Sequence, residues 1–158
     1  MIWHEMILRL MVALVLGALA GCDRERRGKP AGLKTFALVS LGAATFTLIS
    51  VELINDAVAA GGQGYDPLRL VAGIIGGIGF LGAGTIIHSG GHVEGITTAA
   101  GVWIVGAIGV ACGAGYYMIA AMAFGGVLIV WLPIGYVQHR WFSEIVNDDQ
   151  TEGDHSRD

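Results

Sequence analysis

A segment of about 44 residues, 95–138, has no Asp, Glu, Lys, Arg or His and constrains the fold more than any other feature. As one helix it would be roughly 66 Å long, about twice the apolar thickness of a bilayer. A single membrane span cannot use that length. The sequence therefore predicts two spans, 96–112 and 116–137, separated near the glycines and tyrosines of 113–117.

Three further apolar segments, 4–21, 33–54 and 68–87, are also long enough to cross. The last has a defined start, because Asp66 can cap a helix that begins with Pro67. With 54% hydrophobic and 14% charged residues, the composition also indicates a membrane protein. The predicted fold class is an all-α membrane protein with five transmembrane helices. Residues 1–137 form this domain, and 138–158 form a short, acidic, disordered cytoplasmic tail.

The basic residues predict the orientation of these helices. Five of the nine Lys and Arg residues fall within one short stretch around the loop between the first two spans, at Arg24, Arg26, Arg27, Lys29 and Lys34. Because positive loops stay in the cytoplasm, the N-terminus is expected outside and the C-terminus inside. The turn 88–95 has no Lys or Arg, so its own charge does not decide its side. The alternative is a lipoprotein signal that ends at Cys22. It is disfavoured, because the dense positive charge that follows Cys22 would have to be exported across the membrane.

The same stretch contains a charged motif, "DRERRG". Its residues are Asp23, Arg24, Glu25, Arg26, Arg27 and Gly28. One interpretation is a topology signal whose cations also meet anionic lipid. The other is a structured cytoplasmic loop with internal ion pairs, favoured by the two interleaved carboxylates. Nucleic-acid binding is disfavoured, because no aromatic or groove-reading element accompanies the charge.

Three blocks in this order, "RERRG" with "AGLKT", "GIGFLGAG" and "TTAAGVW", make residues 8–130 resemble the MgtC/SapB family of bacterial membrane proteins. The resemblance implies five spans in the bacterial inner (plasma) membrane and an external N-terminus. It also implies stress adaptation in a virulence-associated family, linked to growth under magnesium limitation. Longer members carry a soluble cytoplasmic domain after the fifth span, so this sequence is expected to be of the short type.

Glycines repeat at a spacing of about four residues, which suits close packing of helices in lipid. The glycines predicted to pack are Gly17, Gly21, Gly73, Gly77, Gly79, Gly82, Gly84, Gly109 and Gly113. They suggest a compact bundle that forms a homodimer or joins another membrane complex. Residues 77–82 also match GxGxxG, but a dinucleotide site needs a preceding strand, so no nucleotide is expected.

Polar side chains at membrane depth are costly, so each is expected either to have a function or to pair with another polar group. They are Arg9, Arg69, Thr97 and Thr98, with outer carboxylates at Glu5, Glu52, Asp56 and Asp66. The carboxylates either pair and snorkel at the interface or form a set that responds to Mg²⁺.

The histidines and the cysteines give only weak evidence for a metal site or a disulfide. His88 and His92 flank glycines, so a turn is expected there rather than a metal site. Cys22 and Cys112 should lie too far apart to pair.

No catalytic or cofactor-binding set emerges, so neither an enzyme nor a cofactor is expected. The predicted function is regulatory: the bundle engages a membrane partner under low magnesium or acid conditions. The alternative is a small transporter or channel for an ion such as Mg²⁺.

Overall fold

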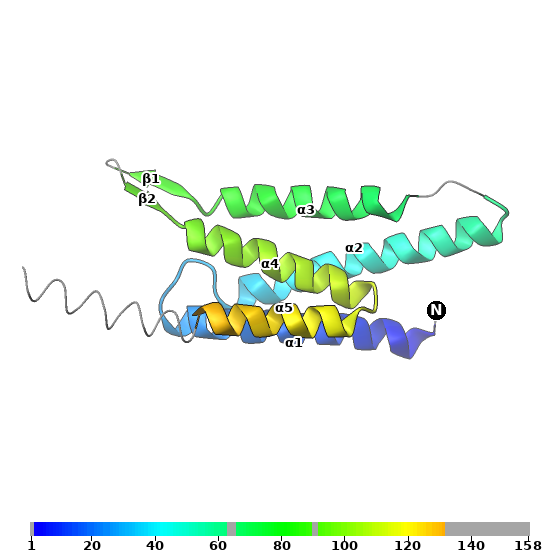
Figure 1. Cartoon of the computed structure of the whole chain (residues 1–158), viewed down its shortest axis with the longest axis horizontal. Coiled ribbons are helices and arrows are strands. Elements are labelled where there is room, and N and C mark those ends of the chain that lie inside the picture. Colours follow the sequence, from blue (N-terminus) through cyan, green and yellow to red (C-terminus); the bar gives the residue numbers. More distant parts are fainter. Residues whose placement is uncertain (1, 63–65, 90–91, 132–158) are drawn as a thin grey trace, which may run out of the picture. The chain divides into compact units, whose positions relative to one another are not determined.

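The structure is a computed structural model that describes residues 2–62, 66–89 and 92–131. These residues form five helices and one two-stranded hairpin (Figure 1). The elements are α1 (Trp3–Arg26), α2 (Leu33–Ala59), α3 (Pro67–Ala83), β1 (Ile87–Ser89), β2 (His92–Glu94), α4 (Ile96–Gly113) and α5 (Tyr117–Ile129).

Three of these helices are long and apolar enough to cross a membrane: α1, α2 and α4, with 24, 27 and 18 residues. Helices α3 and α5 are apolar but shorter, with 17 and 13 described residues. At 1.5 Å per residue α3 is about 26 Å long, slightly less than a typical hydrocarbon core. The prediction of a mostly helical chain with apolar helices long enough to span a membrane is thus confirmed, whereas five crossings and their orientation stay predictions.

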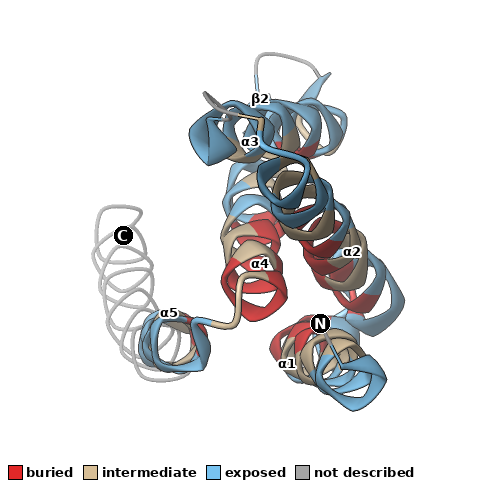
Figure 2. Cartoon of the chain, turned by 90° about the vertical axis from the view of Figure 1, so that its right-hand side faces the viewer, coloured by how far each residue is buried: buried red, intermediate tan, exposed pale blue. Residues whose placement is uncertain are grey.

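The three long helices share the core. Helix α1 packs against α2 and α4, and α2 packs against α4. Their buried faces turn toward one another in Figure 2, while α3 lies against α4 and α2 and is mainly exposed. Phe36, Val102, Val105 and Ile108 are among the largest side chains that are completely buried. The core therefore combines the consecutive helices α1 and α2 with α4, which comes later in the sequence.

Contacts divide the chain into two compact units, 1–124 and 125–158. All sites described below lie in the first unit. The predicted boundary between 137 and 138, and the acidic tail, lie outside the described residues.

The ends of the helices follow local chemistry. Helix α3 begins as predicted, because Asp66 Oδ1 accepts a hydrogen bond from the Leu68 amide at 2.9 Å and Pro67 occupies the first turn. Helix α1 continues to Arg26 instead of stopping near Gly21. No glycine or proline lies between Gly21 and Gly28, and Gly28, with a φ of +62°, ends the helix in a left-handed conformation.

The chain between α3 and α4 differs from the prediction. The third span was expected to reach Ile87, but α3 ends at Ala83 and Ile87 begins the first strand of an antiparallel hairpin. His88 pairs with Val93 and Ser89 with His92. The glycines near the end of α3 weaken the helix, and the β-branched residues that follow favour extended structure.

Gly95 connects this hairpin to α4. Its φ is +90°, and an added Cβ would lie 1.9 Å from the Thr85 carbonyl oxygen. Only glycine fits this position, because both the backbone angle and the space exclude a side chain.

Candidate functional site

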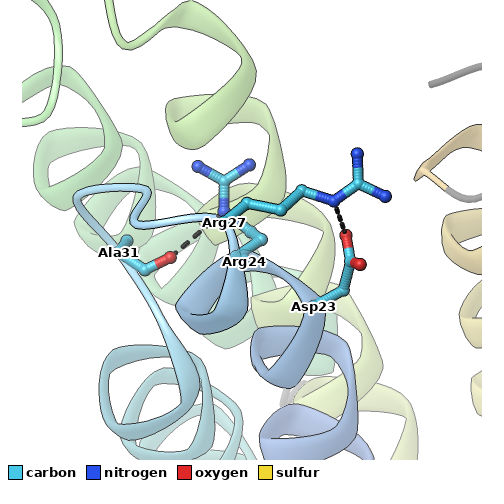
Figure 3. A network of polar contacts seen from close by, with 4 residues as sticks. All are labelled: Asp23, Arg24, Arg27 and Ala31. Atoms are coloured by element: carbon cyan, nitrogen blue, oxygen red, sulfur yellow. Dashed lines mark hydrogen bonds and ion pairs between the residues drawn. The ribbon is translucent and has the colours of Figure 1, made fainter.

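The charged motif at the end of α1 folds back on itself and on α4. Arg27 Nε lies 2.9 Å from Asp23 Oδ2, one helical turn away. Arg24 Nε donates a hydrogen bond to the Ala31 carbonyl oxygen at 3.1 Å, as Figure 3 shows. A second nitrogen of the same guanidinium donates to Thr98 Oγ1 at the start of α4. The motif thus has the internal contacts that a structured loop requires.

Arg24 occupies an unusual environment for a cation. The residue is only 5% exposed, and its guanidinium carbon lies 5.6 Å from the centre of the Phe36 ring. A buried charge is costly unless hydrogen bonds and favourable contacts compensate it. Here the carbonyl, the hydroxyl and the aromatic face contribute to that compensation. Arg24 therefore joins α1, the loop after it, α2 and α4 at one point.

Glu25 connects the motif to α2. Its Oε2 accepts a hydrogen bond from the Leu33 amide at 2.9 Å, so a side chain from α1 caps the first turn of the next helix. Gly32 makes room for this contact, because a Cβ there would lie 1.8 Å from the same oxygen. The carboxylate also suits the positive end of the α2 dipole.

A second arginine contacts the other end of α4. Arg9 donates to the Gly113 carbonyl oxygen at 2.8 Å. Arg9 and Arg24 are 15 residues apart, as are Thr98 and Gly113. The two contacts therefore hold α1 and α4 in one antiparallel register, roughly 22 Å apart along the helices.

A glycine in the turn after α4 leaves space for the Arg9 guanidinium. Gly115 has a φ of +84°, and an added Cβ would lie 2.9 Å from a terminal nitrogen of Arg9. Glu5 lies four residues before Arg9, a spacing that suits an ion pair within one helix. Among the described residues the Arg9 guanidinium binds the Gly113 carbonyl oxygen instead.

Four predicted packing glycines lie at close helix crossings. A Cβ at Gly17 would come within 2.7 Å of the Phe36 carbonyl oxygen, and one at Gly21 within 2.6 Å of the Leu33 Cα. On α4, a Cβ at Gly109 would lie 2.2 Å from the Ser40 carbonyl oxygen. Gly113 approaches α2 in the same way. Helix α2 therefore touches the backbones of both α1 and α4.

The glycines of α3 behave differently. An added Cβ at Gly73, Gly77 or Gly79 meets no atom within 4 Å among the described residues. A Cβ at Gly82 would lie 3.3 Å from the Ala99 carbonyl oxygen of α4, whereas one at Gly84 meets only carbonyls of α3 itself. Among the described residues, Gly73, Gly77 and Gly79 therefore do not mediate helix contacts.

An apolar groove of about 710 Å³ lies between α2 and α3. Gly42 on α2 and Gly73 and Gly77 on α3 line it, together with large apolar side chains. Two of these, Leu38 and Phe46, are more than 60% exposed. Gly73 and Gly77 of α3 thus face a groove rather than another helix of the described chain.

The outer carboxylates are not gathered in one place. Glu5, Asp56 and Asp66 are exposed and Glu52 is half-buried, while Asp66 is engaged as a helix cap. Residues 2–62, 66–89 and 92–131 contain no group of three or more His, Cys, Asp and Glu that could hold a metal ion. The proposed Mg²⁺-responsive set therefore does not form a site within this part of the chain.

The remaining predicted residues have simpler surroundings. Arg69 and Thr97 are exposed, whereas Thr98 is buried where it meets Arg24. Cys22 and Cys112 are both unpaired, as expected from their separation. Sequence reasoning missed the partners of the motif, Ala31 and Phe36, along with the buried Ser40, because no spacing pattern identifies them.

These features describe an apolar helical bundle whose first helix is held to the fourth by arginines near both ends. Residues 10–140 match the model of the MgtC family. The chain therefore belongs to the MgtC family.

Several curated proteins resemble this chain. It is 44% identical over 123 residues to "Protein MgtC" of Salmonella typhimurium LT2, covering 78% of this chain and 49% of that protein. It is 39% identical over 113 residues to "Putative magnesium transporter YhiD" of Escherichia coli K12, covering 72% and 53%. A Synechocystis protein, slr0014, is 41% identical over 127 residues, covering 80% and 51%. The chain thus spans about half the length of these relatives. No solved structure matches it.

Proposed function

We propose that this chain is a multi-pass protein of the bacterial plasma membrane and acts by engaging another membrane protein through its helices. Its role is adaptation to low magnesium or acid conditions. Membership of the MgtC family and the three long apolar helices support membrane residence. The basic loop after α1 supports an orientation with that loop in the cytoplasm.

The open face of α2 and α3 carries the argument for engagement of a partner. Inside lipid, helices associate through small residues that let their backbones approach. Gly42, Gly73 and Gly77 line the groove and have no atom of the described chain near the position of a side chain. The bundle itself is already closed by α1, α2 and α4. Among the described residues, this second glycine face is therefore open to contacts with another protein.

A substitution pair tests the proposal. Gly73→Leu with Gly77→Leu should fill the groove and abolish the ability of the chain to restore growth of a deletion strain at low magnesium. Gly76→Leu is the matched control, because Gly76 is equally open but does not line the groove. Immunoblots must show equal membrane levels of all variants. Normal growth with the double variant would contradict the proposal.

Magnesium transport is the second candidate, favoured by the name of the Escherichia coli relative, "Putative magnesium transporter YhiD". Proteoliposomes that contain only this chain and a Mg²⁺-sensitive dye would decide between the two. Flux above that of protein-free vesicles would support transport. Inert vesicles, with loss of growth in the groove variant, would support partner engagement.

A further inference from the structure

Three exposed cations lie between the last turn of α1 and the first turn of α2. Arg26, Lys29 and Lys34 are exposed, and their side chains make no hydrogen bond or ion pair with the described residues. The neighbouring cations differ: Arg24 is buried against α4, and Arg27 pairs with Asp23. We call Arg26, Lys29 and Lys34 the cationic surface.

The nearby carboxylates do not compete for these cations. Asp23 is occupied by Arg27 at 2.9 Å, and Glu25 caps α2 through the Leu33 amide. Both acidic groups are thus used in contacts that shape the loop. The charge left for an outside ligand is positive.

The backbone beneath the cationic surface is held in one conformation. The Lys29 amide donates to the Arg24 carbonyl oxygen at 3.0 Å and the Gly28 amide to the Glu25 carbonyl oxygen at 3.1 Å. This is the pattern of a helix end with glycine in the left-handed region. The Arg24 bond to Ala31 then fixes the return of the chain toward α2. A preformed surface loses less conformational entropy when it binds.

The position of these residues identifies the ligand chemistry. Arg26 ends α1, and Lys34 lies in the first turn of α2, two helices that are long and apolar enough to cross a membrane. Cations at such ends lie at the depth of lipid headgroups and are attracted by anionic lipids. We propose that the cationic surface binds the headgroup of an anionic phospholipid. This inference does not depend on the identity of a protein partner or on which side the loop faces.

Native mass spectrometry of the detergent-solubilised full chain can test this. The chain is titrated with phosphatidylglycerol and with zwitterionic phosphatidylcholine, and the dissociation constant of each bound lipid is measured. The variant Arg26→Gln, Lys29→Gln and Lys34→Gln should lose most of the preference for phosphatidylglycerol. Each cation near an anionic surface raises the affinity roughly fivefold. Removal of all three is therefore expected to lower the affinity for phosphatidylglycerol by up to about a hundredfold, and by no less than about tenfold.

The matched control is Arg69→Gln, which removes an exposed cation at the start of α3. It should keep the preference within about twofold, because one remote charge contributes little. Unchanged melting temperatures would show that the triple variant is folded. Equal binding of the two lipids by the native chain, or equal losses in both variants, would overturn the proposal. Displacement of phosphatidylglycerol by excess inorganic phosphate would also overturn it, since the site would then take a free anion.

Discussion

Replacing Arg24 by methionine should destabilise the bundle more than any other single charge removal in the motif. The change keeps an unbranched side chain but removes donors to the Ala31 carbonyl and the Thr98 hydroxyl. Hydrogen bonds from a charged donor contribute about 1.5–3 kcal/mol each. The contact with Phe36 adds about 0.5–2 kcal/mol, and methionine no longer has a charge to desolvate. We expect a net loss of about 2–4 kcal/mol in the free energy of unfolding.

Reversible unfolding in mixed micelles of dodecyl maltoside and SDS, followed by circular dichroism, measures this loss. Arg26→Met is the matched control, because Arg26 is exposed two residues away and should change the free energy by no more than about 0.5 kcal/mol. Thr98→Val removes only one acceptor and should cost about 1–2 kcal/mol. If Arg24→Met unfolds at the same SDS fraction as Arg26→Met, the buried arginine does not hold α1 to α4.

Other predictions concern the helix crossings and the orientation. Gly109→Ala places a methyl group 2.2 Å from the Ser40 carbonyl oxygen and should lower the free energy of unfolding by about 1–3 kcal/mol. Gly76→Ala, at an open position, should leave this free energy unchanged. Equal effects of the two substitutions would refute the close crossing of α2 and α4. Arg9→Met removes the hydrogen bond to the Gly113 carbonyl oxygen and should lower the free energy of unfolding by about 1–2 kcal/mol in the same assay. An unchanged free energy would show that this contact is not stabilising. Lys29→Cys, in a background without native cysteines, should react with an impermeant maleimide only after the cells are opened; labelling of intact cells would reverse the proposed orientation.

The sequence predicted the helical segments well where the signal was local. The start of α3 follows from Asp66 and Pro67, and the apolar runs of α1, α2 and α4 are long enough to identify without a structure. The end of α3 was misplaced, because an apolar run that includes β-branched residues does not distinguish helix from strand.

The candidate site was only partly predictable. The charged motif was visible as a cluster, and a structured loop was one of its two interpretations. Its partners were not visible, because Thr98 lies 74 residues after Arg24. The same holds for the glycines, because their spacing predicted helix packing at both Gly17 and Gly77. In the structure Gly17 contacts α2, whereas Gly77 faces the groove.

The sequence by itself thus determined the apolar helices, the cap of α3 and the family, since each rests on neighbouring residues or on ordered motifs. Only the tertiary structure decided which glycines touch a helix, which arginine is buried and which carboxylates stay apart. The physical reason is that these contacts depend on how helices cross, and the spacing within one helix does not specify its neighbours.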